Sequence, residues 1–176
     1  ASHSTDDAPA APSERARGGI IFIPIMHSYI VLLRGVMPSG KNRIPKMAEL
    51  REALEAAEFA DVTTYIQSGN IILRSPHSPE QTSARIAEII RAYCGAELGV
   101  ITTTAEELRA HLDASPFGAD YLEERVFYPT TMDTIDPERL EALWQEDYGA
   151  EELRAVAGRL YLYIPTDASR SRLSNN

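Results

Sequence analysis

The order of the predicted secondary-structure elements between residues 28 and 103 constrains the fold more than any other feature of this sequence. Apolar runs and turn residues divide this part of the chain into six segments that are either extended or helical in pattern. The predicted strands and helices, in chain order, lie at residues 28–33, 45–57, 61–67, 70–73, 79–94 and 100–103. The order strand, helix, strand, strand, helix, strand is the split βαβ pattern of a ferredoxin-like fold. We therefore expect an α+β fold, with one ferredoxin-like unit (an alpha-beta plait) over residues 26–114.

The first strand and the first helix are predicted from the spacing of apolar residues. Residues 28–33 are mostly apolar at consecutive positions, which indicates a central strand buried on both faces. Apolar residues recur at helical spacing from Met47 to Leu54 and give the first helix one buried face. Pro45 suits the first helical position, but Ile44 before it is a poor N-cap. The first-turn N–H groups of this helix therefore need another acceptor.

Other helix ends carry clear capping signals. Residues 78–81, Ser-Pro-Glu-Gln, have the pattern of a capping box with proline at the first helical position. Gly95 suits the left-handed conformation that ends many helices. Thr104 and Glu107 predict a second capping box, at the start of a short helix over residues 104–112.

The second half of the chain repeats the first pattern weakly. Its predicted segments are a strand at 125–128, a helix opening at Asp136, a hairpin at 152–156 and 159–164, and a helix start at 169–176. A full unit needs a further helix and strand, so we expect a second ferredoxin-like unit that is incomplete at its C-terminus. Residues 1–18 are rich in Ala, Ser, Pro and charge and lack any structural period. The expected organisation is a flexible tail at 1–25, a first unit at 26–114 and a second unit at 115–176.

A basic loop follows the first predicted strand, although the net charge of the chain is −9. Arg34, Lys41 and Arg43 lie in this loop. In a βαββαβ sheet, the loop after the first strand and the turn between the second and third strands lie at the same end. We therefore expect residues 34–43 and the turn at 67–70 to form one ligand-binding site. The candidate residues are Arg34, Gly35, Gly40, Lys41, Asn42, Arg43, Gln67, Ser68, Gly69 and Asn70.

Such a site suits a small molecule that carries phosphate or carboxylate groups. Hydrogen bonds between cationic side chains and these groups are worth about 1.5–3 kcal/mol each. The loop is not a Walker A motif, because Asn42 stands where the magnesium-binding Ser or Thr is required. A solvated basic loop beside an ordinary tight turn is the alternative interpretation.

Charge and composition argue against several functional classes. The acidic net charge disfavours a general nucleic-acid coat protein, and the third predicted strand lacks the stacking aromatics of an RNA recognition motif. Cys94 is the single cysteine and no Cys and His pair has zinc-site spacing, so we expect no disulfide, metal or cofactor. The four histidines are scattered and are interpreted as structural or surface side chains. No apolar run approaches the roughly 20 residues of a membrane helix, and we expect a cytoplasmic protein.

Motifs in the first half resemble those of a known protein family. They are Arg34-Gly35, Gly40-Lys41-Asn42-Arg43, Lys46-Met47-Ala48-Glu49-Leu50 and Tyr65-Ile66-Gln67-Ser68-Gly69-Asn70. Together they resemble the hallmark of domain-of-unknown-function family 1697, over about residues 26–174. The resemblance implies two ferredoxin-like units in a bacterial-type cytosolic protein without an assigned activity. Residues 169–174 also resemble the family, whereas the Thr-Arg-Asn-Trp-like segment that usually follows is absent.

Three functional hypotheses follow from these features. The first is a module that binds a phosphate- or carboxylate-bearing small molecule at the basic loop. The second is a protein–protein interaction or oligomerisation module that uses the open edge of an incomplete second sheet. The third is an enzyme acting on a phosphorylated small molecule, which ranks lower because the sequence offers no convincing general base.

Overall fold

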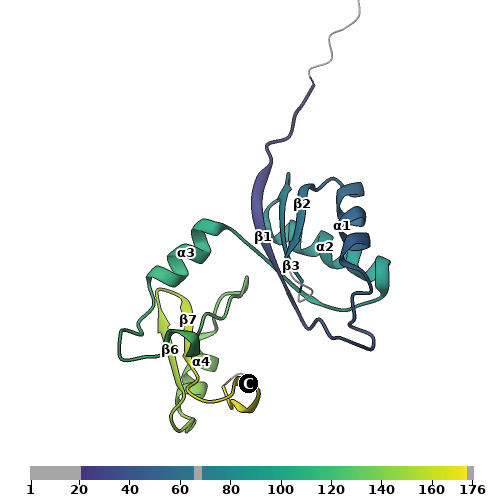
Figure 1. Ribbon diagram of the computed structural model, residues 1–176. Coiled ribbons are helices and arrows are strands. Elements are labelled where there is room, and N and C mark those ends of the chain that lie inside the picture. The colour runs from purple at the N-terminus through teal and green to yellow at the C-terminus, as the bar shows by residue number, and fades with distance from the viewer. Residues whose placement is uncertain (1–20, 66–68, 174–176) are drawn as a thin grey trace, which may run out of the picture.

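The computed structural model describes residues 21–65 and 69–173, which form a mixed α+β fold with two antiparallel sheets (Figure 1). The strands are β1 (His27–Arg34), β2 (Ala60–Tyr65), β3 (Asn70–Ser75), β4 (Gly99–Thr103), β5 (Val126–Phe127), β6 (Glu152–Val156) and β7 (Arg159–Tyr163). The α-helices are α1 (Met47–Ala56), α2 (Pro79–Cys94), α3 (Ala105–Asp113) and α4 (Pro137–Trp144). We call β1–β4 with α1 and α2 the first lobe, and β5–β7 with α4 the second lobe. α3 lies between them along the chain.

The first sheet has the strand order β2-β3-β1-β4, and every neighbouring pair of strands is antiparallel. α1 and α2 lie on the same side of this sheet (Figure 1). Side chains from that face and from both helices form the main core, among them Val31, Ile71, Leu50, Leu54 and Ile86. Each such buried side chain stabilises the fold by about 1.5–3 kcal/mol.

The opposite face of the first sheet is more open than the sequence predicts. Tyr29 and Val31 of β1 are buried, but Ile30 and Leu32 on the other face are only half-buried. Ile72 of the neighbouring β3 is exposed. The prediction that the first strand is buried on both faces is therefore wrong. The reason is that both helices cover the same face, which an antiparallel sheet permits.

α1 begins later than its proline suggests. Its first helical residue is Met47 and its N-cap is Lys46, so the prediction that Pro45 occupies the first helical position is wrong. Lys46 provides no side-chain cap, in agreement with the expected lack of a local acceptor. Ile44 is buried in the core of the first lobe. The backbone of Lys46 after it is extended, with φ −144° and ψ 120°, so the helix begins only at Met47.

The capping box predicted for α2 is confirmed, whereas the one predicted for α3 is present only in part. The Ser78 hydroxyl accepts from the Gln81 N–H at 3.2 Å, and the Gln81 side chain accepts from the Ser78 N–H at 3.3 Å. Gly95 ends α2 in the left-handed conformation with φ 72°. Thr104 caps α3 by accepting from the Glu107 N–H at 3.1 Å, but the Glu107 carboxylate pairs with Arg159 at 2.9 Å instead of completing a capping box. Local hydrogen bonds therefore fix both helix starts.

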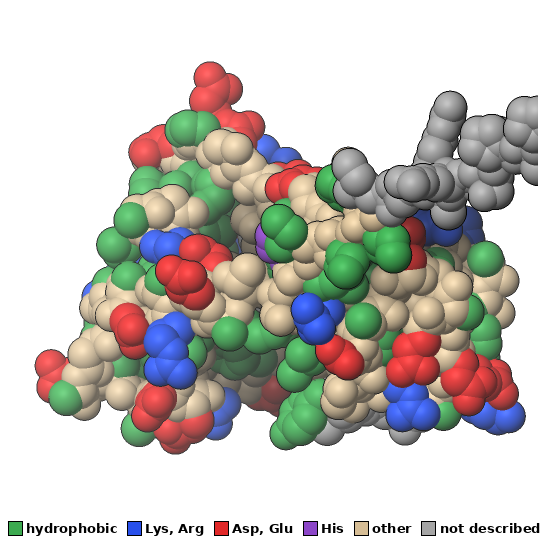
Figure 2. Space-filling model, turned by 90° about the horizontal axis from the view of Figure 1, so that it is seen from above, with side chains coloured by type: hydrophobic (Ala, Val, Ile, Leu, Met, Phe, Trp, Pro, Cys, Tyr) green, Lys and Arg blue, Asp and Glu red, His purple; other side chains and the backbone are tan. Residues whose placement is uncertain are grey.

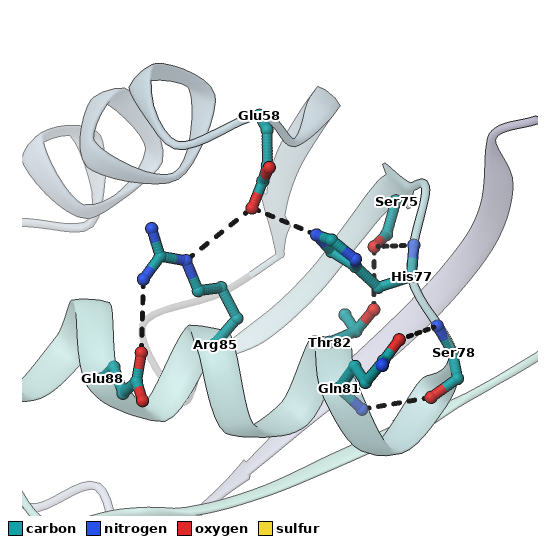
Figure 3. Close-up of polar contacts among 8 residues, drawn as sticks. All are labelled: Glu58, Ser75, His77, Ser78, Gln81, Thr82, Arg85 and Glu88. Carbon is teal, nitrogen blue, oxygen red and sulfur yellow. Dashed lines mark hydrogen bonds and ion pairs between the residues drawn. The ribbon is translucent and has the colours of Figure 1, made fainter. Parts of the chain in front are cut away.

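Polar side chains join β3 and the segment after α1 to the first half of α2 (Figure 3). The buried hydroxyls of Ser75 and Thr82 lie 2.8 Å apart, and the Ser75 hydroxyl also accepts from the N–H of His77 at 3.1 Å. The Glu58 carboxylate lies 3.1 Å from His77 Nε2 and 3.7 Å from Arg85 Nε. These contacts join the first half of α2 to β3 and to the segment between α1 and β2.

The second sheet has the order β5-β7-β6, and its two faces differ. Tyr161 of β7 is fully buried on one face, where its hydroxyl donates to the carbonyl of His111 at 3.0 Å. Leucines of β6 and β7, Leu153 and Leu162, pair across the strands on the other face. The strands thus show the alternation of a sheet that packs differently on its two sides.

The end of the described chain departs from the prediction of a helix over residues 169–176. Ala168–Arg170 form a single 3₁₀ turn, and the N-cap Asp167 accepts from the Ser169 N–H at 2.9 Å. Leu173 packs into the structure and is 8% exposed. Residues 174–176 lie outside the described part of the chain. Among the described helices, none has the length and apolar character needed to cross a membrane.

Candidate functional site

The loop after β1 has a defined backbone conformation. Gly35 and Gly40 have φ of 90° and 80°, a region that side chains disfavour. The Met37 N–H donates to the Asn42 carbonyl at 2.9 Å, and the Arg43 N–H donates to the Gly40 carbonyl at 3.3 Å. The glycines thus allow the loop to turn back on itself and to close through its own hydrogen bonds.

Asn42 ties this loop to the segment that leads into β4. Its side-chain oxygen accepts from the Glu97 N–H at 3.1 Å. The Glu97 carboxylate in turn accepts two hydrogen bonds from Arg91 of α2, at 2.8 and 3.0 Å. Hydrogen bonding by Arg91 lowers the pKa of Glu97, and the charge of nearby Lys41 lowers it further. The candidate Asn42 therefore has a structural role in fixing the loop.

The hairpin tip between β2 and β3 lies against the end of β1. A Cβ atom at Gly69 would lie 2.9 Å from Leu33 Cδ1, and Gly69 has φ 93°. Asn70 is the first residue of β3 and pairs with Tyr65. The candidates Gln67 and Ser68 lie outside the described residues. The described parts of the loop and of the tip thus lie at the same end of the sheet.

The cations of the loop differ in their partners. Lys46 pairs with Glu49 at 2.8 Å, and the Tyr93 hydroxyl donates to the same carboxylate at 2.7 Å. The hydrogen bonds from Lys46 and Tyr93 lower the pKa of Glu49. Within residues 21–65 and 69–173, by contrast, Arg34, Lys41 and Arg43 form no ion pair and are exposed. Three cations thus remain available to a ligand in the described structure.

Arg34 also borders a cavity of the second lobe. This cavity, which we call the second-sheet cavity, has a volume of about 550 Å³. It is lined mainly by apolar side chains of β5–β7, α4 and the segments beside them, including Phe127, Leu143, Leu153, Leu162, Ile164 and Leu173. The sequence predicts Arg34 as a site residue but does not predict the second-sheet cavity. The residues that line the cavity follow Arg34 by about a hundred positions or more.

A second cavity of about 340 Å³ lies between the two lobes. Its lining includes residues 101–104 at the end of β4, His111 of α3 and Arg159 of β7. His111 is buried, and its Nε2 lies 2.9 Å from the carbonyl oxygen of Leu160. The carbonyl can only accept, so Nε2 carries the proton of this contact. The buried position agrees with the structural role predicted for this histidine, but the sequence carries no signal for the cavity.

Figure 2 shows the molecule as two lobes with a recess between them, in which hydrophobic side chains are visible. The two cavities share Pro129, Thr130 and Leu160 in their linings, so they adjoin each other at this junction. Among the described residues, no three His, Cys, Asp or Glu side chains gather as a metal site would require. The arrangement offers cations and apolar walls rather than metal ligands.

Comparison with known proteins agrees with this architecture. The fold is similar to that of "conserved bacterial protein SP0830 from Streptococcus pneumoniae", with a TM-score of 0.61 and 24% sequence identity. The similarity covers 85% of this chain and 84% of that one. The search of curated proteins gave no match. The family pattern described as "Protein of unknown function (DUF1697)" matches residues 26–161, and the chain therefore belongs to this family.

Proposed function

We propose that the protein binds a small anionic ligand, carrying phosphate or carboxylate groups, at the end of the first sheet. The observation that carries the proposal is that Arg34, Lys41 and Arg43 are exposed and form no ion pair within the described residues. They lie in or beside a loop that Asn42 fixes in place. A fixed loop loses little conformational entropy when a ligand binds, which favours affinity.

Backbone donors support the same proposal. Among the described residues, the N–H groups of Gly40, Lys41 and Asn42 donate to no acceptor of the protein. Successive backbone N–H groups in such turns are suited to anions. The start of α1 is a less suitable anion site, because the Glu49 carboxylate lies in its first turn. We therefore place the ligand at the loop rather than at the helix start.

Calorimetric titration with inorganic pyrophosphate, tripolyphosphate and citrate at low salt tests the proposal. We expect at least one of these anions to bind, and the Lys41→Ala variant to bind it about tenfold more weakly, since one charge-assisted hydrogen bond is worth about 1.5–3 kcal/mol. Lys46→Ala is the matched control, because Lys46 is also exposed but already pairs with Glu49. Absence of binding by folded protein, or equal losses in both variants, would contradict the proposal.

A second candidate, self-association, is favoured by one observation. Ile21, Phe22, Ile23 and Ile25 are 79–88% exposed, outside any helix or strand. Exposed apolar side chains that follow one another along the chain often mark an interaction surface. Light scattering on the wild type and on a Phe22→Ser/Ile23→Ser variant tests this candidate. We expect a concentration-dependent dimer that the variant loses, whereas a wild-type monomer at high concentration would contradict it.

The domain organisation belongs to the same proposal. We interpret the first lobe as a ferredoxin-like unit, because its strand order and helix positions agree with that fold. The second lobe has three strands and one helix in the described residues, and we interpret it as an incomplete unit of the same kind. The expected division at 26–114 and 115–176 and a cytoplasmic location remain predictions.

A further inference from the structure

We propose that the second-sheet cavity binds an amphiphilic carboxylic acid, with its apolar body between the second sheet and α4 and its carboxylate on Arg34. This inference rests on the proposed function in one respect, since both use Arg34 as a cation. It adds a ligand class and a site in the second lobe that the basic loop alone does not indicate. The residues of the cavity supply separate observations for it.

The cavity has the size and walls of a small-molecule site. Its volume of about 550 Å³ lies within the range of roughly 300–1,000 Å³ that ligand pockets show. Leu153 and Leu162 line it from the sheet and Leu143 from α4. Water in contact with such walls finds few hydrogen-bond partners, so an apolar ligand that displaces it lowers the free energy. The walls therefore select an apolar molecular body.

The charge at the border of the cavity selects the other end of the ligand. Arg34 is the only charged residue in the described lining, and it forms no ion pair within the described structure. Its cross-strand partner is Gly99, so no second side chain crowds it from β4. A guanidinium group matches a carboxylate through two parallel hydrogen bonds. An apolar acid satisfies both features, whereas a multiply charged phosphate would leave the apolar walls unused.

The single tryptophan of the chain provides a direct readout. Trp144 follows Leu143, a residue of the cavity wall, and its Nε1 donates to the carbonyl of Leu153 at 3.1 Å. A ligand between Leu143 and Leu153 should therefore change the fluorescence of Trp144. The titration uses hexanoate, octanoate and decanoate at neutral pH, and the alcohols of the same chain lengths, all below their aggregation concentrations.

We expect the dissociation constant to fall about fourfold for each added methylene, because each buried methylene contributes a fixed transfer free energy. Each acid should bind about tenfold more tightly than the matching alcohol. In Arg34→Gln this ratio of acid to alcohol affinity should fall to near one, with alcohol binding unchanged. Arg139→Gln is the matched control, since Arg139 is an exposed arginine of α4 that does not line the cavity, and it should keep the ratio.

Two outcomes would overturn the inference. They are no binding of any acid or alcohol, and equal affinity of acids and alcohols in the wild type. Pyrophosphate titration of the same proteins separates this failure from that of the proposed function. Pyrophosphate binding that depends on Lys41, without decanoate binding, contradicts only this inference. Decanoate binding that depends on Arg34 but not on Lys41, without binding of pyrophosphate, tripolyphosphate or citrate, contradicts only the proposed function.

Discussion

At the scale of single residues, glycines decide how the end of the first sheet is built. Gly69 and Gly40 both have positive φ, at 93° and 80°, but their surroundings differ. Gly69 is buried against Leu33, whereas a Cβ at Gly40 would meet nothing within 4 Å. The two positions therefore separate the cost of the backbone conformation from the cost of a close contact.

We predict that Gly69→Ala destabilises the protein by about 2–4 kcal/mol, because the methyl group adds a clash with Leu33 to the backbone strain. Gly40→Ala should cost only about 1–2 kcal/mol, from the strain alone. Urea unfolding followed by circular dichroism measures both values. Equal destabilisation of the two variants would show that the contact with Leu33 is easily relieved.

At the scale of secondary-structure elements, a reciprocal capping box and a buried hydroxyl pair fix the start of α2. The capping box of Ser78 and Gln81 lies beside the buried hydroxyl pair of Ser75 and Thr82 (Figure 3). The first pair of residues is exposed and the second is buried. Loss of a buried partner costs more than loss of an exposed one, because water cannot replace it.

We predict that Ser75→Ala lowers the free energy of unfolding by about 1–3 kcal/mol, since it removes a hydrogen-bond partner from both the Thr82 hydroxyl and the His77 N–H. Ser78→Ala, the comparison on the exposed side, should cost about 1 kcal/mol. The double variant Ser75→Ala/Thr82→Val should lower the free energy of unfolding by less than the two single variants together. In the double variant neither hydroxyl of the pair is left without a partner. Additive costs in a double-mutant cycle by urea unfolding would contradict this coupling.

At the scale of the whole molecule, carboxylates that are hydrogen-bonded in the folded state link stability to pH. Hydrogen bonds from Lys46 and Tyr93 lower the pKa of Glu49 below its ordinary value of 4.5, and Arg91 does the same for Glu97. Groups with a lowered pKa stabilise the folded state above the pKa of the unfolded chain. That stabilisation is lost as the pH falls through the lowered folded-state pKa.

We therefore predict that the melting temperature stays nearly constant from pH 7 to pH 5 and falls as the pH decreases below about 4.5. Glu49→Gln should lower the melting temperature slightly at pH 7 and reduce the fall at acid pH. Glu55→Gln, on the same helix and without an ion pair in the described structure, should leave the pH profile unchanged. Scanning calorimetry from pH 7 to pH 3 measures the profiles, and a flat wild-type profile would rule out this linkage.

The sequence by itself determined the elements whose signals are local. The capping box at Ser78, the helix end at Gly95 and the hairpin turn at residues 157–158 depend on residues within four positions of one another. The predicted start of α1 at Pro45 was wrong, because Ile44 is buried in the core and the chain stays extended through Lys46 before the helix begins.

Only the tertiary structure decided which distant residues became neighbours. Three features join residues that lie far apart in the chain. They are the cavity beside Arg34, the contact of His111 with Leu160, and the placement of α1 and α2 on one face of the first sheet. A residue's own side chain indicates its chemistry, but its burial and partners depend on how the lobes and helices pack. Local hydrogen bonds therefore fixed the elements, and long-range packing fixed the candidate sites.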